Sequence, residues 1–277
     1  MSVINTNTSA LRAQNGSRVA NVGLQQAMER LSSGKRINSA KDDAAGLAIA
    51  SKMTSQIRGM NQAVRNANDG ISFASTAEGG LSEVTNMLQR IRELAVQSAN
   101  GTYSTSDRTN LNSEVTELKA QITNVLATSE FNGTRIFNSN ASGATYAAAS
   151  GAVTIQTGVN SGDTVSISFT SLADLAAATA VDTAANASTA LGNVDTALTN
   201  VNATRAKLGA AQSRLESSVN VLSNNVTNLS DARSRIEDAD FSEETANLAR
   251  SQILSQASTA MLAQANQSQQ GVLSLLK

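Results

Sequence analysis

The sequence has 277 residues, a formal net charge of −1 and 3% aromatic residues, and it contains no Pro, Cys, His or Trp. Without Cys the chain forms neither disulfides nor thiolate metal sites, and without His it lacks the commonest general base and metal ligand. The net charge favours neither nucleic acid nor an anionic membrane as a partner, and the absence of Pro permits long uninterrupted helices.

The first 35 residues carry a sparse apolar stripe among Asn, Ser and Gln. The apolar members are Val3, Ile4, Leu11, Val19, Val22, Met28 and Leu31. The segment lacks the basic region and apolar stretch of a secretory signal peptide, so we expect no cleaved signal. No run of about 18 apolar residues occurs, so we expect no membrane insertion.

Two segments with apolar residues three and four positions apart follow, which is the spacing of amphipathic helices. The first contains Ile57, Met60, Val64, Ala67, Ile71 and Ala74 and, beyond Gly79-Gly80, Leu81, Val84, Leu88, Ile91 and Ala95. The second contains Leu111, Val115, Leu118, Ile122 and Val125. Residues 100–107 between them read as a turn in which Ser106 or Asp107 caps the next helix. We therefore predict one long helix that turns back into a shorter one.

The middle of the chain has a different composition, with no Lys or Arg between Arg135 and Arg205. Apolar and polar residues alternate over 152–157 and again over 164–169, and the turn residues Asn160-Ser-Gly-Asp lie between the two runs. This pattern predicts a β-hairpin. The Ala/Thr-rich stretch 173–190 reads as a loop or a weak helix.

A heptad repeat covers residues 191–236. Its main series is Val194, Val201, Leu208, Leu215, Leu222, Leu229 and Ile236, and the interleaved series is Leu191, Leu198, Arg205, Gln212, Val219, Val226 and Arg233. Seven-residue spacing sustained over this length predicts a coiled-coil helix. At ~1.5 Å per residue the helix spans roughly 70 Å, so it needs equally long partners, which residues 57–125 supply. We expect Arg205, Gln212 and Arg233 to be polar core positions that fix the register.

Residues 251–276 contain no charged side chain. The apolar residues of this C-terminal segment include Leu254, Met261, Leu262, Ala265, Val272, Leu273, Leu275 and Leu276, and Leu248 lies just before it. Neither end of the chain can bury its stripe alone, so we expect the ends to pair with each other and with other subunits. Their Gln, Ser and Asn content predicts that they order on assembly.

The predicted fold is mainly α: a long antiparallel helical bundle or coiled coil formed by the N- and C-terminal segments, with one small β-hairpin region. We expect an inner terminal coiled-coil region of residues 1–43 and 236–277. Residues 44–140 and 188–235 form a helical bundle domain, and 141–187 form a hairpin insert within it.

Several long motifs resemble the bacterial flagellin family. They are the segments at 31–46, 65–72 and 88–100, the Phe131-Asn-Gly-Thr-Arg-Ile-Phe sequence, the segment at 233–241, and the Val272–Leu276 tail. They occur in the family's order, and the resemblance covers about residues 1–140 and 190–277. Larger flagellins carry outer domains in the middle, whereas this chain has little more than the hairpin there, so the resemblance implies a core-only form.

The resemblance implies a structural subunit that polymerises with itself into an extracellular flagellar filament for motility. The ends would line its inner tube. Subunits would leave the cytoplasm unfolded through the type III export apparatus, with an export chaperone and with filament cap and junction proteins as partners. No cofactor is implied. The predicted polymerisation residues are Val3, Ile4, Leu11, Val22, Leu31, Leu254, Met261, Leu262, Leu273, Leu275 and Leu276.

By the same resemblance, the helix around residues 88–100 matches the surface that host flagellin-sensing receptors recognise. The matching residues are Arg90, Leu94, Gln97 and Glu114. A solvated amphipathic helix explains the same charges without any receptor.

Two other classes stay open beside the filament subunit: a hook–filament junction protein, and an intracellular coiled-coil adaptor. An enzyme is disfavoured, because without His or Cys it needs a Ser-Lys or carboxylate site. The carboxylates of Lys41-Asp42-Asp43 read as a solvated helix start favoured by the helix dipole.

Overall fold

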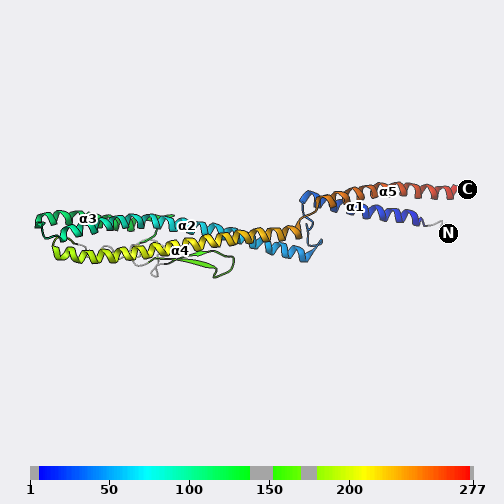
Figure 1. Cartoon of the computed structure of the whole chain (residues 1–277). Coiled ribbons are helices and arrows are strands. Elements are labelled where there is room, and N and C mark those ends of the chain that lie inside the picture. Colours follow the sequence, from blue (N-terminus) through cyan, green and yellow to red (C-terminus); the bar gives the residue numbers. More distant parts are fainter. Residues whose placement is uncertain (1–5, 138–151, 170–179, 275–277) are drawn as a thin grey trace. The chain divides into compact units, whose positions relative to one another are not determined.

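The computed structural model describes residues 6–137, 152–169 and 180–274 (Figure 1). The elements in chain order are α1 (Thr8–Ser33), α2 (Ala44–Ala99), α3 (Thr105–Thr128), β1 (Glu130–Phe131), β2 (Thr134–Arg135), β3 (Ala152–Gln156), β4 (Thr164–Ser168), α4 (Ala184–Glu237) and α5 (Phe241–Ser274). The predicted mainly helical fold with a small hairpin region is confirmed. The chain forms two compact units, one from residues up to Ile57 together with those from Thr227 onward, the other from Arg58–Val226.

The second unit is a bundle in which α2, α3 and α4 share one apolar core. Gly79 and Gly80 do not interrupt α2. Most buried residues of α2 repeat every seven positions in two series, Met60, Ala67, Ala74, Leu81, Leu88 and Ala95, and Ala63, Gly70, Ala77, Val84, Ile91 and Ser98. This is the two-position repeat of a coiled-coil seam.

The facing helix α4 buries the main heptad series at Val194, Val201, Leu208, Leu215 and Leu222, whereas Leu229 is half-buried. The second buried series is not the predicted one. It lies one residue earlier and consists of Ala190, Ala197, Thr204 and Ala211. Small side chains allow the helices to approach closely: a Cβ built on Gly70 would lie 3.1 Å from Leu215 Cδ1. Leu198 and Val219 pack at the flank of this seam.

The expectation that Arg205 and Gln212 are core positions is therefore wrong. Both are half-buried at the edge of the α2–α4 seam. Arg205 Nη2 lies 2.8 Å from Glu78 Oε1, and Gln212 Nε2 donates to Ser75 Oγ at 3.3 Å. At the edge a long polar side chain reaches across the seam and keeps its polar end near water, so it avoids the cost of burial.

Substitution by Leu is expected to have different effects on stability at the neighbouring positions Ala211 and Gln212. Ala211→Leu is expected to destabilise the bundle by about 1–3 kcal/mol, because the added atoms overpack a closed seam. Gln212→Leu, one residue away, is expected to change stability by no more than about 0.5 kcal/mol. Urea unfolding of both variants measures the difference. Equal losses would mean that the seam does not run through Ala211.

The turn from α2 into α3 is closed by a capping box. Ser104, and not Ser106 or Asp107, is the N-cap residue. Its hydroxyl accepts from Asp107 N at 3.2 Å, and Ser104 N donates back to Asp107 Oδ2 at 3.0 Å. This reciprocal pair satisfies two backbone N–H groups that the first helical turn leaves free.

Hydrogen bonds from the Ser104 hydroxyl and backbone hold the pKa of Asp107 below its ordinary value of 3.8. A carboxyl with a depressed folded pKa stabilises the fold above its unfolded pKa. That contribution is lost as the pH falls through the folded value. We expect Ser104→Ala to raise the pKa of Asp107 toward 3.8, as followed by carboxyl-carbon NMR titration. An unchanged titration curve would contradict this cap.

The described part of the second unit also contains two antiparallel hairpins. The predicted one pairs β3 with β4 over Ala152↔Ser168 to Gln156↔Thr164 and buries Val165 and Ile167. The other, β1–β2, was not predicted. Its Asn-Gly turn, with Asn132 at φ 49°, is a strong short hairpin signal that strands of two residues made easy to miss. Phe131 of β1 meets Phe73 of α2 edge to face at 5.7 Å. Residues 170–179 lie outside the described part, and α4 begins at Ala184.

Candidate interaction surface

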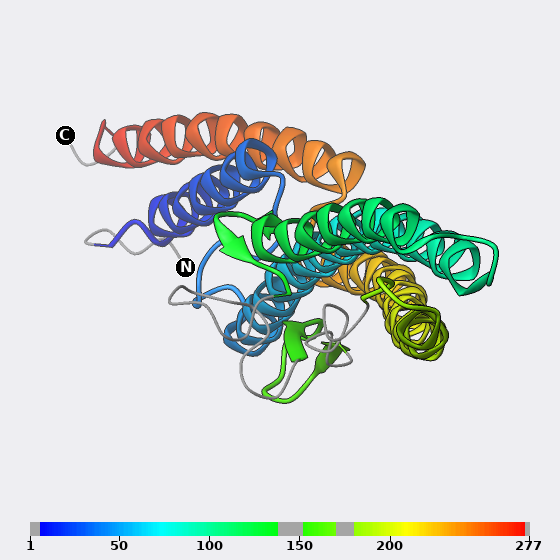
Figure 2. The ribbon, with the colours of Figure 1, turned by 90° about the vertical axis from the view of Figure 1, so that its left-hand side faces the viewer.

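Helices α1 and α5 lie side by side in the other compact unit (Figures 1 and 2). Asn7 Nδ2, at the start of α1, donates to Ala265 O at 2.9 Å, near the end of α5. Arg30 Nη1, at the end of α1, lies 2.8 Å from Glu244 Oε1 in the first turns of α5. The two helices are therefore antiparallel, as expected for the paired ends of the chain.

Small residues make most of the contact between α1 and α5. Ala20, Ala27 and Ala265 are buried there. A Cβ on Gly16 would lie 3.3 Å from Ser258 Oγ, and one on Gly23 would lie 3.0 Å from Ser251 Oγ. Small side chains let the helices approach closely but remove little apolar surface from water, so this pair is weakly stabilised by itself.

The large apolar side chains of the pair mostly remain in contact with solvent. Among the described residues, eight of the twelve exposed large hydrophobic side chains lie on α1 and α5. They are 51% to 70% exposed and comprise Leu11, Val19, Val22, Met28, Phe241, Ile253, Leu254 and Met261. Single exposed apolar residues are ordinary, but a concentration of this kind marks a surface that binds something.

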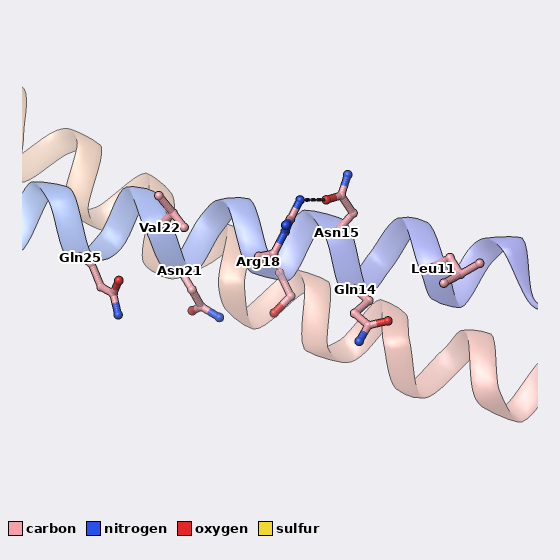
Figure 3. A pocket seen from close by; sticks show the side chains of 8 residues that line it. Leu11, Gln14, Asn15, Arg18, Asn21, Val22 and Gln25 are labelled. Carbon is pink, nitrogen blue, oxygen red and sulfur yellow. Dashed lines mark hydrogen bonds between the residues drawn. The ribbon is translucent and has the colours of Figure 1, made fainter. Parts of the chain in front are cut away.

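Figure 3 shows a surface of α1 where Leu11 and Val22 lie among Gln14, Asn21 and Gln25. It borders the contact with α5, because Ser255 Oγ of α5 donates to Asn21 Oδ1 at 3.0 Å. The one charged side chain drawn there, Arg18, donates to Asn15 Oδ1 at 3.1 Å. A second apolar surface is a groove along the α1–α5 contact. Its lining residues include Ala13, Gly16, Leu254, Ala257 and Met261. Each surface combines apolar side chains with uncharged amides or hydroxyls and one arginine, Arg18 on the first and Arg12 in the groove, which suits contact with another helix of similar character.

The structure places the predicted polymerisation residues in three groups. Leu11, Val22, Leu254 and Met261 are exposed on the pair. Leu31 and Leu262 are half-buried. Val3, Ile4, Leu275 and Leu276 lie outside the described residues, and Leu273 is in the last turn of α5, where its side chain is not described.

The loop between α1 and α2 contains structural residues whose role was not predicted from the sequence. Arg36 Nη2 donates to Ile236 O at 2.7 Å, and Lys35 Nζ lies 2.5 Å from Glu237 Oε1. Basic groups at this place complement the carbonyls and the negative dipole end of α4. The only signal was the Lys-Arg pair of the 31–46 motif, which does not reveal a partner 200 residues away.

Asp42 and Asp43 also have structural roles. Hydrogen bonds from Ser39, together with the Asn38 amide, lower the pKa of Asp42. Asp43 Oδ1 accepts from Gly46 N at 2.9 Å in the first turn of α2. Asp42 therefore satisfies backbone N–H groups of the loop before α2, and Asp43 satisfies one at the start of α2.

The four residues matched to receptor recognition are not all accessible. Arg90 is half-exposed and lies 2.9 Å from Glu114 Oε1, and Gln97 Nε2 donates to Tyr103 Oη at 3.1 Å. The expectation that Leu94 is part of this receptor-contact surface is corrected by the structure, because Leu94 is only 1% exposed and belongs to the bundle core. It lies on the α2 face that packs against the other helices, so in this fold it supports the surface without being part of it.

Neither a metal site nor a membrane span emerges from the described ranges. Within residues 6–137, 152–169 and 180–274, no three Asp or Glu residues gather in a way that could hold a metal ion. In the same part of the chain, none of the helices is long and apolar enough to cross a membrane. The feature that distinguishes the surface of α1 and α5 is its exposed apolar area, which a partner can bury.

Comparison with known proteins matches two family models to most of the chain. Residues 4–142 match the bacterial flagellin N-terminal helical region, and residues 191–276 match the bacterial flagellin C-terminal helical region. Both ends of the chain, including α1 and α5, fall within these matches.

Individual relatives agree with the family models. Flagellin of Salmonella muenchen is 50% identical over 165 residues, covering 60% of this chain and 31% of that protein. Flagellin B of Vibrio cholerae (El Tor Inaba N16961) is 46% identical over 169 residues, covering 61% of this chain and 43% of that protein. The aligned part is thus less than half of either relative. The crystal structure of Bacillus cereus flagellin is similar at TM-score 0.52 and 29% identity, covering 61% of this chain and 94% of that one.

Proposed function

The chain belongs to the bacterial flagellin family, and from this we propose that it is a structural subunit that polymerises with itself into the flagellar filament used for motility. The observation that carries the proposal is the concentration of exposed large apolar side chains on α1 and α5. A helix pair that leaves this much apolar surface in water gains stability when other copies cover it.

The expected gain is large enough to drive assembly. Full burial of one large apolar side chain contributes about 1.5–3 kcal/mol, so covering the remaining half contributes on the order of 1 kcal/mol for each. Eight such side chains supply several kcal/mol. This gain must offset the cost of fixing each subunit in place, which repeated contacts along a polymer make possible.

The two apolar surfaces favour an open polymer over a closed dimer. The α1 surface that includes Leu11 and Val22 and the groove along the α1–α5 contact have no lining residue in common. A contact between two different surfaces is heterologous, and such contacts generate a helical filament when their rotation does not close.

The remaining parts of the proposal follow from family membership. The terminal region, residues 1–43 and 236–277, orders on assembly and forms the filament core. Subunits are exported unfolded by the flagellar type III apparatus and function outside the cell. An export chaperone, the filament cap and junction proteins are partners, and host flagellin-sensing receptors bind the surface around Arg90, Gln97 and Glu114. The subunit is not an enzyme and needs no cofactor.

Both matched family models describe flagellin regions, which favours a filament subunit over a hook–filament junction protein. The number of copies in filaments sheared from cells separates the two, because a junction protein is present in few copies. Detection of the protein outside the cell distinguishes a filament subunit or a junction protein from an intracellular adaptor, which would be found only in the cytosol.

Electron microscopy of the purified chain after seeding tests the proposal, and a truncation sharpens it. Deleting residues 258–277 removes Met261, Leu262 and Ala265 and with them much of the α1–α5 contact. We expect a soluble chain that keeps the bundle, as measured by circular dichroism, and forms no filaments. Abundant filaments from the truncated chain would contradict the role given to this end.

A further inference from the structure

The sequence contains three Asn-Gly pairs in three different backbone settings. Asn15-Gly16 lies inside α1, Asn100-Gly101 lies in the turn between α2 and α3, and Asn132-Gly133 lies in the turn between β1 and β2. Asn followed by Gly is the pair in which the asparagine amide is lost most readily, because a residue without a side chain leaves its backbone nitrogen open. Comparing the three pairs therefore separates the effect of the local sequence on the rate of amide loss from the effect of the backbone structure.

We propose that Asn100 is a self-modification site, at which the folded chain promotes conversion of its own asparagine amide to a carboxylate with the help of Arg108. Nothing in the assembly function requires this reaction. It uses only water as a co-reactant.

The reaction balances as follows. The backbone nitrogen of Gly101 loses its proton and attacks Cγ of Asn100, so that an N–Cγ bond forms. The Cγ–Nδ2 bond breaks and the nitrogen leaves as ammonia, which leaves a five-membered succinimide. Water then opens the ring at either carbonyl to give aspartate or isoaspartate. The net change is the addition of one water and the loss of one ammonia.

The turn holds the Asn100 side chain close to the attacking nitrogen. Asn100 Oδ1 accepts from Thr102 N at 3.2 Å, which folds the side chain back over the Gly101 peptide. Both Asn100 and Gly101 are exposed, and a Cβ built on Gly101 would have nothing within 4 Å. Water can therefore reach the ring once it has formed.

Arg108 supplies the electrostatic contribution. Its Nη2 donates to Asn100 O at 3.0 Å, and its Nε donates to Ser98 O at 2.9 Å, which fixes the guanidinium over the turn. The Asn100 carbonyl and the Gly101 N–H belong to one peptide group. When that N–H loses its proton, the negative charge is shared with the carbonyl oxygen, where a cation stabilises it as an oxyanion hole stabilises its oxyanion.

The other two pairs serve as comparisons within the same chain. The Asn15-Gly16 peptide is held in the regular hydrogen bonding of α1, and helical backbone keeps the next nitrogen turned away from the side chain. Asn132-Gly133 is exposed in a turn, with positive φ at both residues. Asn132-Gly133 therefore has the same residue pair and the same exposure to water as Asn100-Gly101, so a difference in rate between the two comes from the surrounding structure.

The experiment follows amide loss in the full chain at neutral pH by peptide mass spectrometry. Tryptic cleavage after Arg92 and Arg108 isolates Asn100 as the single Asn of its peptide. In Arg108→Gln the peptide extends to Lys119 and also contains Asn110 and Asn112, so fragmentation of the peptide assigns the converted residue. We expect Asn100 to convert faster than Asn15 and Asn132, and roughly three- to tenfold faster in the native chain than in urea. Arg108→Gln is expected to remove this native acceleration and leave Asn132 unchanged.

The direction of each result is decisive. A fold that merely restricts the turn slows the reaction, so a native rate at or below the rate in urea would overturn the proposal, and that comparison needs no variant. Faster conversion in Arg108→Gln would also overturn it, since loosening of the turn would then be what promotes the reaction. Gly101→Ala, which has open space for its Cβ, should suppress conversion while the helix content is retained.

Discussion

Replacing Leu254 and Met261 together by Asp is expected to abolish polymerisation and to leave the α2–α3–α4 bundle intact. Both side chains line the groove along the α1–α5 contact and are more than half exposed in the single chain. In the monomer the new carboxylates therefore remain in water and cost little. In an assembled polymer the same positions would be covered, and burying an unpaired charge costs several kcal/mol.

The critical concentration for polymerisation is expected to rise at least roughly a hundredfold, since each 1.4 kcal/mol corresponds to a factor of ten. Pelleting of polymer over a range of concentrations measures it. The matched control exchanges the same positions for other apolar residues, Leu254→Met with Met261→Leu, and should polymerise at nearly the normal concentration. Normal polymerisation of the Asp variant would mean that this groove is not an assembly contact.

The second large effect concerns the bundle. Leu215→Ala is expected to lower the free energy of unfolding by about 2–5 kcal/mol, because it leaves a cavity in a closed seam beside Gly70. Leu229 occupies the same heptad position two repeats later but is half-buried. Leu229→Ala is therefore expected to cost less than half as much.

Urea unfolding followed by circular dichroism measures both variants at equal protein concentration and below the critical concentration. Equal losses at Leu215 and Leu229 would contradict the burial that separates them. A loss at Leu215 below about 1 kcal/mol would mean that the α2–α4 seam can collapse around the missing atoms.

Much of this fold is determined locally and was predictable from the sequence. The seven-residue spacing of Val194, Val201, Leu208 and Leu215 is a property of the chain itself, and so is the alternation that forms β3 and β4. Helices and hairpins depend mainly on neighbouring residues, so their signals survive in a single sequence. The uncharged stretch from Ser251 onward likewise indicates, without any structure, an end that needs a partner.

Other features depended on which residues meet across the fold. The heptad spacing alone predicted that Arg205 and Gln212 are core positions, but the tertiary structure buries Thr204 and Ala211 in their place. The reason is that the helices approach closely at Gly70 and leave room only for small side chains. Leu94 likewise looks like a surface residue from its motif and is buried once α2 has packed against its neighbours.

The terminal surface shows the same division. Composition determines that α1 and α5 carry apolar side chains without charge along most of α5, and hence that they need partners. Only the tertiary structure decided which side chains the two helices use on each other. Ala20, Ala27 and Ala265 are buried in the contact between α1 and α5, whereas Leu11, Leu254 and Met261 remain exposed. The reason is geometric: Gly16 and Gly23 bring the helices too close for large side chains between them, so the larger ones are displaced to the surface that further copies can cover.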